Sequence, residues 1–334
     1  MKQKILIIQT AFIGDVVLAT GLVEKLHWYF PGAEIDFLLR KGNEGLLAGH
    51  PFIHETLVWD KKENKNRNLF SILKQIRRRR YDKVINLQRY FTTGLLLVFS
   101  RGKEKTGFDK NPWSRFFDRR VKHELDGRHE YERNHDLVRA FTDETPALPK
   151  LYPSETDFSR VKKYKTGLYV CIAPASVQFT KQFPPEKWIR FMDRLPDSTR
   201  VYLIGAPGDE PLAKTIQQGS RHANTESLCG KLNYLESAAL MRDAAMNYVN
   251  DSAPLHFASA MNAPVTAVFC STIPAFGFGP LSKKSFIVET NTPLSCRPCS
   301  LHGEPKCPEG HFRCAMEIDE TRLYRHFLQS QEAL

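Results

Sequence analysis

The sequence K-I-L-I-I-Q-T-A-F-I-G-D, residues 4–15, decides the fold because it joins a buried strand to a helix through a short turn. Residues 4–9 are almost entirely apolar, as in a strand that is covered on both faces. Residues 15–29 place apolar side chains at helical spacing, and Pro31 and Gly32 end that helix. A buried strand, a tight turn and a helix form the repeating unit of a parallel α/β sheet.

The same alternation recurs along the chain and divides it into two parts. In the first part we predict further strands at 34–39, 55–59 and 83–87, with helices at 43–48 and 68–79. The pattern stops in a proline-rich linker, residues 145–156, and then restarts. In the second part we predict strands at 168–173, 200–204, 246–250 and 265–269, with helices at 185–195, 210–218, 234–243 and 254–261.

This organisation predicts the α/β fold class, with two Rossmann-like parallel-sheet domains that face an interdomain cleft. The first domain spans residues 1–150 and the second spans residues 157–316. Residues 317–334 are expected to form a C-terminal helix that packs back on the first domain. The chain has 334 residues, 42% of them hydrophobic, which is enough to build two cores of ordinary size.

The net charge of +11 is concentrated in the first half of the chain. Residues 1–150 contain 28 Lys and Arg against 19 Asp and Glu, whereas residues 151–334 contain 20 against 18. Much of the excess lies in residues 61–83, which include an unbroken run from Arg77 to Arg80. Such a run is either the solvated end of a helix or an electropositive face for an anionic partner. No nucleic-acid motif accompanies it, so no nucleic-acid partner is expected.

Ligands of open α/β sheets bind beyond the carboxyl ends of the strands, so the loops after the strands are the candidate sites. The first of them, residues 10–15, lacks the glycine pattern of a dinucleotide site, which disfavours an NAD-dependent oxidoreductase. Gly14 permits the close approach of a ligand. Asp15 either caps the helix or acts as a general base toward a sugar hydroxyl, and the helix dipole is expected to keep its pKa low.

Two loops of the second domain offer small residues and charges to a phosphorylated ligand. In residues 173–181, Ala175 and Ser176 precede Lys181, which is either a surface lysine or a partner for a diphosphate. After the next strand, Gly205 opens a loop in which Glu210, or the aspartate before it, either caps a helix or binds ribose hydroxyls.

The strongest candidate for phosphate binding is N-D-S-A-P-L-H, residues 250–256. Asp251 or Ser252 ends a strand and caps a helix, and Pro254 occupies the first helical turn. The unpaired N–H groups at such a helix start, around Ala253, make an anion site.

Together these loops resemble glycosyltransferase family 9, the family of ADP-heptose:lipopolysaccharide heptosyltransferases. The resemblance runs from Lys4 to about Ile318, and four features carry it: I-G-D-V at 13–16, Y-D-K-V-I-N-L-Q at 81–88, the Lys181, Pro184 and Trp188 positions, and residues 250–256. It implies a GT-B architecture and inverting transfer from a nucleotide-diphosphate sugar, with ADP-heptose favoured. It also implies that the reaction needs no cofactor and no catalytic metal.

The resemblance further implies roles for five site residues. Asp15 falls on the general base, Lys181 on the residue that neutralises the leaving diphosphate, and Asp251, Ser252 and Ala253 on a phosphate-binding turn. We also expect donor binding by Ala175, Ser176, Gly205, Glu210 and His256. Acceptor binding falls on Gly14, Gln88 and Arg89, and the implied acceptor is a lipopolysaccharide core or another lipid-linked acidic glycan. Another nucleotide sugar, another surface glycan and a non-catalytic binding role remain open alternatives.

Four cysteines, Cys296, Cys299, Cys307 and Cys314, define a Cys-rich segment, residues 296–314. Their spacing allows a structural zinc site, free thiols or disulfides, of which disulfides fit a cytoplasmic protein least.

The location of the protein follows from short apolar runs and from the charge. The runs at 5–8 and 94–100 are too short for a secretory signal or a membrane span. We therefore expect a cytoplasmic protein that binds the inner membrane surface peripherally, because an acidic, membrane-bound acceptor would attract the basic first domain.

Overall fold

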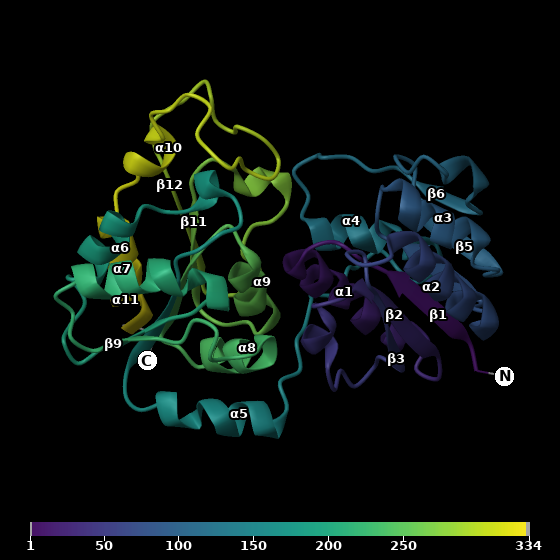
Figure 1. The fold of residues 1–334 in the computed structure, drawn as a ribbon, viewed down its shortest axis with the longest axis horizontal. Coiled ribbons are helices and arrows are strands. Elements are labelled where there is room, and N and C mark those ends of the chain that lie inside the picture. The colour runs from purple at the N-terminus through teal and green to yellow at the C-terminus, as the bar shows by residue number, and fades with distance from the viewer. Residues whose placement is uncertain (1, 332–334) are drawn as a thin grey trace. The chain divides into compact units, whose positions relative to one another are not determined.

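The computed structural model of the protein describes residues 2–331, which fold as two compact units (Figure 1). The first unit is Met1–Tyr152 and the second unit is Pro153–Leu334. Each unit contains one six-stranded sheet, and every strand pair in both sheets for which a register is defined is parallel. The predicted α/β class with two Rossmann-like parallel sheets is therefore confirmed.

The sheet of the first unit has the strand order β3-β2-β1-β4-β5-β6. Its strands are β1 (Lys4–Ile8), β2 (Glu34–Arg40), β3 (Glu55–Trp59), β4 (Lys83–Asn86), β5 (Glu104–Phe108) and β6 (Arg119–Val121). Its helices are α1 (Ile13–Tyr29), α2 (Lys65–Arg79), α3 (Phe91–Phe99) and α4 (Glu130–Asp136), with short 3-10 turns at η1 (Glu44–Leu47), η2 (Ser114–Phe116) and η3 (Arg139–Phe141).

Both faces of this sheet are covered, as the apolar run in β1 predicted. Leu6 and Ile8 of β1 share one core cluster with Ile76 of α2 and Leu97 of α3. Ile5 and Ile7, which point to the opposite face, are equally buried. Continuous burial on both faces explains why this strand lacks the alternation of a half-exposed strand.

The sheet of the second unit has the order β12-β11-β10-β7-β8-β9. Its strands are β7 (Tyr169–Ala173), β8 (Arg200–Leu203), β9 (Thr225–Ser227), β10 (Met246–Asn250), β11 (Val265–Phe269) and β12 (Ser285–Glu289). Its helices are α5 (Glu155–Val161), α6 (Pro185–Met192), α7 (Glu210–Gly219), α8 (Tyr234–Arg242), α9 (Ala253–Ala260), α10 (Arg313–Met316) and α11 (Thr321–Gln331). The 3-10 turns are η4 (Lys162–Tyr164), η5 (Phe179–Lys181), η6 (Pro207–Asp209) and η7 (Pro274–Phe276).

Each sheet has the Rossmann strand order, in which the chain reverses direction across the sheet next to its first strand. The switch point of the first unit lies between β1 and β4, and that of the second lies between β7 and β10. Ligands of such folds bind outside the carboxyl ends of the strands at the switch point. The fold thus marks one candidate site in each unit.

The C-terminal helix α11 packs within the second unit. Leu323 and Phe327 of α11 are buried in the core of the second unit with Phe191 of α6 and Tyr248 of β10. The apolar face of α11 thus belongs to the core of the second unit, and its packing on the first domain stays a prediction. The end of that predicted helix, residues 332–334, lies outside the described residues. Among residues 2–331, none of the helices is both long and apolar enough to cross a bilayer.

Candidate active site

Asp15 lies in the first turn of α1, directly after β1 at the switch point of the first unit. Helix α1 begins at Ile13, and the extended Phe12 is its N-cap. The Phe12 N–H donates a hydrogen bond of 3.0 Å to the Asp15 carboxylate, which therefore reaches back over the helix start. Asp15 thus caps the helix, as one of the two predicted readings required, and the cap holds its carboxylate at the sheet edge.

The pKa of Asp15 is raised to about 6, which corrects the expectation that the helix dipole keeps it low. Burial of the carboxylate is the main cause, and the neighbouring Glu130 carboxylate adds to it. The Phe12 N–H and the Arg40 guanidinium act in the opposite direction and do not compensate. A carboxylate with this pKa is ionised at neutral pH and accepts a proton more readily than an ordinary aspartate, as a general base must.

A buried polar network lies beside Asp15 at the ends of β1, β3 and β4. The Lys61 ammonium donates to the Thr10 carbonyl oxygen (2.9 Å) and hydroxyl oxygen (2.8 Å). The Thr10 hydroxyl donates to the Gln88 side-chain oxygen (3.0 Å), and the Gln88 amide nitrogen donates to Gln9 (2.6 Å). Gln88, predicted to bind an acceptor, is buried and engaged in this network, so in this structure it positions the Thr10 loop.

The remaining groups at this edge are largely cationic. Burial, Arg40 and Lys65 lower the pKa of Lys61 to about 8, so its positive charge lacks compensation. The Arg40 guanidinium lies 4.8 Å from the centre of the exposed Phe12 ring. Arg89, a predicted acceptor-binding residue, follows β4 and is partly exposed, as is Gly14 in the first turn of α1. Sequence reasoning missed Arg40 and Lys61, because single basic residues after two strands carry no recognisable motif.

The second unit brings together two predicted site residues that are 70 positions apart in sequence. The Lys181 ammonium lies 2.8 Å from the Asp251 carboxylate, across the switch point between β7 and β10. The Thr272 hydroxyl donates to the same carboxylate oxygen of Asp251 at 2.7 Å. Both charged side chains are largely buried, at 16% and 8% exposure, so their attraction is weakly screened.

The start of α9 forms the other half of this site. Asn250, at the end of β10, is fully buried and bonds to the Phe183 N–H (3.0 Å) and to the Pro174 carbonyl (2.7 Å). Ser252 is the N-cap of α9 without a side-chain cap bond, and Ser252 and Ala253 are partly exposed. This helix start therefore presents backbone N–H groups and a hydroxyl next to Lys181, the arrangement expected of an anion site.

The other predicted donor-binding residues differ in how they are used. Ala175 and Ser176 are partly exposed in the loop after β7, on the same sheet edge as Lys181. Gly205 and Glu210 follow the neighbouring strand β8, where the Glu210 carboxylate already accepts a hydrogen bond from Ser227. His256 is different, because it is 5% exposed and packs its ring edge-on against Phe278, as a core residue of α9 does.

The Cys-rich segment supports the Lys181 loop. The Glu304 N–H donates to the Thr180 hydroxyl (2.7 Å), and the Thr180 N–H donates to the Glu304 carbonyl (3.1 Å). Gly303, at φ +77°, lies so close that a Cβ added there would be 2.7 Å from Lys181 Cγ. The Arg297 guanidinium fastens the segment to the sheet edge through the carbonyls of Cys270 (2.7 Å) and Thr272 (2.8 Å). The segment is thus part of the wall that holds Lys181.

None of the four thiols of this segment forms a disulfide bond. Burial and neighbouring cysteines raise the pKa of Cys314 to about 11 and raise that of Cys299. Within residues 2–331, no three His, Cys, Asp or Glu side chains converge in a metal-binding arrangement. Of the three alternatives predicted from the spacing, this arrangement matches free thiols and does not support the zinc site.

Two Rossmann-ordered parallel sheets form a GT-B architecture, the fold of solved heptosyltransferase structures. The model of a family described as "Glycosyltransferase family 9 (heptosyltransferase)" matches residues 69–306. The chain belongs to this family, and the predicted resemblance is confirmed.

Individual relatives agree with this assignment. Lipopolysaccharide heptosyltransferase 3 of Escherichia coli is 28% identical over 283 residues, which are 78% of this chain and 82% of that protein. The crystal structure of a family 9 glycosyltransferase from Veillonella parvula matches with a TM-score of 0.88 and 19% identity, covering 100% of this chain and 99% of that one. The ADP-heptose lps heptosyltransferase II structure from E. coli has a TM-score of 0.80 and 22% identity, with 99% and 100% coverage.

Proposed function

We propose that the protein transfers a heptose, or a closely related sugar, from a nucleotide diphosphate to an acidic lipopolysaccharide core acceptor, with inversion and without a metal. The observation that carries the proposal is the pair of switch-point sites. One unit holds a carboxylate with a pKa of about 6, and the other holds Lys181 beside the open start of α9. ADP-heptose is the favoured donor because related enzymes are named for it or carry ADP in their structures.

Each step of an inverting transfer has a group to perform it. The acceptor hydroxyl oxygen attacks the anomeric carbon while the bond from that carbon to the diphosphate oxygen breaks. Asp15 takes the hydroxyl proton, and the diphosphate leaves with the bonding electron pair. Lys181 and the N–H groups of Ser252 and Ala253 stabilise the developing negative charge, which is commonly the largest contribution to such catalysis. The reaction requires the acceptor at Asp15 and the donor diphosphate at Lys181 to be bound at the same time.

The ion pair with Asp251 explains how Lys181 remains ordered before the donor binds. Without an anion, the buried ammonium is compensated by the Asp251 carboxylate at 2.8 Å. An arriving diphosphate adds negative charge beside this pair and strengthens the hold on the ammonium. Asp251 is therefore a positioning residue, and it also receives the Thr272 hydroxyl.

The cationic edge of the first unit supports an acidic acceptor. Arg40 lies close enough to Asp15 to lower its pKa, and burial, Arg40 and Lys65 lower the pKa of Lys61 at the same sheet edge to about 8. A carboxylate or phosphate on the acceptor would supply the missing negative charge and orient the hydroxyl toward Asp15. We propose that this acceptor is lipid-linked and that the enzyme works in the cytoplasm, peripherally at the inner membrane face.

The test is turnover of ADP-heptose with a heptose-deficient lipopolysaccharide core acceptor, followed by mass spectrometry of the acceptor. GDP-, UDP- and dTDP-sugars serve as competing donors in parallel reactions. We expect the acceptor to gain the mass of one heptose from ADP-heptose. The Lys181→Met variant should not produce this mass gain at a comparable rate. Stable binding of ADP-heptose without turnover would indicate a binding protein, whereas turnover of another nucleotide sugar alone would reject the donor assignment.

A further inference from the structure

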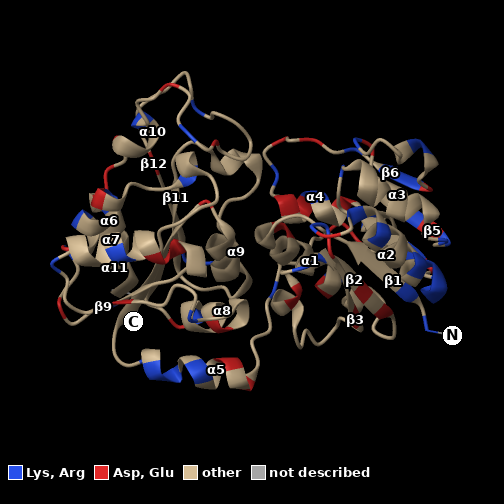
Figure 2. Ribbon diagram, viewed as in Figure 1, with Lys and Arg blue, Asp and Glu red and all other residues tan. Residues whose placement is uncertain are grey.

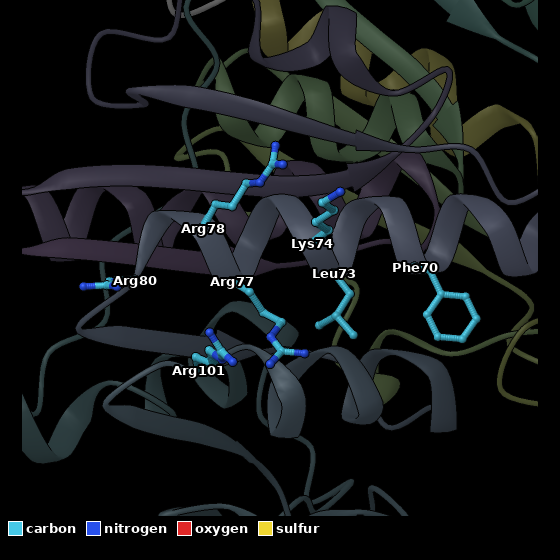
Figure 3. Close-up of a pocket in the computed structure, with 7 residues that line it drawn as sticks. All are labelled: Phe70, Leu73, Lys74, Arg77, Arg78, Arg80 and Arg101. Carbon is cyan, nitrogen blue, oxygen red and sulfur yellow. The ribbon is translucent and has the colours of Figure 1, made fainter.

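Helix α2, with Arg80 after it and Arg101 two residues past α3, forms a basic pocket in the first unit (Figure 3). The pocket has a volume of about 480 Å³ and is lined by the cations Lys74, Arg77, Arg78, Arg80 and Arg101 beside the ring of Phe70. Figure 3 shows Arg77 on α2 and Arg101 beyond α3 extending toward each other. We call these six residues the basic patch.

The basic patch is separate from the proposed active site. Crossover helices of a parallel sheet run opposite to the strands, so the C-terminal end of α2 lies at the amino edge of the sheet. Arg80 and Arg101 also lie just before β4 and β5, at that same edge. Asp15 and Lys61 lie at the carboxyl edge. The proposed active site therefore does not account for the basic patch.

The five cations have no compensating partner in the described part of the chain. No ion pair or side-chain hydrogen bond joins any of them to residues 2–331, and α2 contains no acidic residue (Figure 2). The neighbouring Arg79 behaves differently, because it is ion-paired with Asp36 at 2.7 Å and with Glu55. A helix C-terminus favours cations in its last turn, but that preference does not place Lys74 and Arg101 around the same pocket. Like charges this close repel one another.

Backbone conformation adds an independent argument. Arg80 (φ 51°) and Arg101 (φ 64°) both adopt the left-handed conformation, each just past the end of a helix. This position favours glycine, because any side chain there costs conformational energy. Here two such positions carry long cationic side chains that line one pocket, although glycine would relieve both the strain and the repulsion.

Exposed aromatic side chains lie on the same face of the sheet. Phe70 is 69% exposed, and Phe99 and Phe116, in α3 and η2, are 47% and 46% exposed. Trp113 packs against both of the latter, with ring centres 6.0 Å and 5.8 Å away. Cations interspersed with exposed aromatic rings are typical of surfaces that bind the headgroup region of a membrane, where the rings enter the interface and the cations meet phosphates. A free-phosphate site has no use for the exposed rings of Phe99 and Phe116.

We propose that the basic patch docks the enzyme on a bilayer containing anionic phospholipids, with headgroup phosphates in the pocket and Phe70 in the interface. The proposal rests on the proposed function only in that a lipid-linked acceptor lies in such a bilayer. It assigns membrane attachment to the amino edge of the first sheet and leaves the carboxyl edge to the acceptor sugar.

The test is co-sedimentation of the full-length protein, without nucleotide sugar, with vesicles of phosphatidylcholine alone or with 30% phosphatidylglycerol. The variant R77Q/R78Q/R101Q removes three cations of the patch, and R194Q/K162Q/K283Q removes three exposed cations of the second unit as a matched control. Each cation near an anionic surface strengthens binding about fivefold, so the patch variant should bind on the order of 100-fold more weakly. The control should bind like the wild type, and F70S should also weaken binding.

The outcomes separate this proposal from the others. Equal weakening in both triple variants, or binding that does not depend on phosphatidylglycerol, would overturn it. Inhibition of vesicle binding by inorganic phosphate at constant ionic strength would assign the pocket to a free phosphate, and tight binding of duplex DNA without vesicle binding would assign it to nucleic acid. Transfer to a deacylated, water-soluble acceptor is measured separately. Absence of transfer by the wild-type protein would reject the proposed function, whereas equal transfer by the wild type and the patch variant leaves the docking proposal standing.

Discussion

The Asp15→Asn variant should lose transfer activity and yet be more stable than the wild type at pH 8. Asparagine keeps an oxygen for the Phe12 N–H but has no charge to bury. The pKa of Asp15 rises from 3.8 to about 6 on folding. At about 1.4 kcal/mol per pKa unit, a rise of about two units corresponds to roughly 3 kcal/mol. The residue keeps part of its surface exposed, which reduces the expected gain to about 1–2 kcal/mol.

The pH dependence of this gain has a definite sign. Because the folded-state pKa is raised, protonation favours the folded state, and that stability is lost as the pH rises through about 6. The advantage of Asp15→Asn should therefore be largest at pH 8 and clearly smaller at pH 5. Differential scanning calorimetry should show the first unit melting several degrees higher at pH 8, at about 2–4 °C per kcal/mol. Asp197→Asn, at an exposed position of the second unit, is the control and should change the melting temperature at neither pH.

Catalysis supplies the second half of this prediction. Removal of a general base lowers kcat by about 10²- to 10⁴-fold. In the wild type, kcat/KM should rise with pH through about 6 as Asp15 loses its proton. A variant that is less stable than the wild type at pH 8, a gain that is the same at pH 5, or near-normal turnover would each refute the reasoning.

The remaining predictions concern Lys181 and the acceptor edge. Lys181→Met should lower kcat by about 10²- to 10³-fold in kinetic assays. It should also destabilise the second unit in urea unfolding, because the Asp251 carboxylate loses its ion-pair partner. The double variant Lys181→Met/Asp251→Asn should recover the stability but not the activity. Gly303→Ala should lower kcat, because the added Cβ would lie 2.7 Å from Lys181 Cγ and force that side chain to move. Gly310→Ala is the control for backbone strain, because Gly310 has a similar φ but open space around it, and this variant should leave kcat unchanged. Lys61→Met should raise KM for the acidic acceptor by about tenfold at nearly constant kcat, and Lys62→Met should leave KM unchanged; an unaltered KM in Lys61→Met would exclude that contact.

Most strands could be predicted from the sequence, whereas β5, β6, β9 and β12 were not predicted. The predicted limits of β3, β10 and β11 match those in the structure. The edge strands β6 (R-R-V) and β9 (T-E-S) have three residues each and are partly exposed, so no periodicity distinguishes them from loops. The strand orders depend on which strands pair, and no local pattern specifies that pairing.

The sequence indicated which residues form the candidate site but not how they interact. Lys181 and Asp251 each followed from a loop after a strand, but their ion pair exists because β7 and β10 are neighbours in the sheet. The raised pKa of Asp15 could not be foreseen, because it arises from burial and from Glu130, which is 115 positions away in sequence. His256 was selected as part of a motif, and its side chain is buried on α9 beside Phe278.

The most direct test of the central claim is the anomeric configuration of the product. The wild-type enzyme would be incubated with ADP-heptose and a heptose-deficient core acceptor, and the new glycosidic bond would be assigned by proton NMR. We expect a single product whose anomeric configuration is opposite to that of the donor, formed at least about 10²-fold more slowly by Asp15→Asn. A product that retains the donor configuration, or one formed equally well by Asp15→Asn, would contradict it.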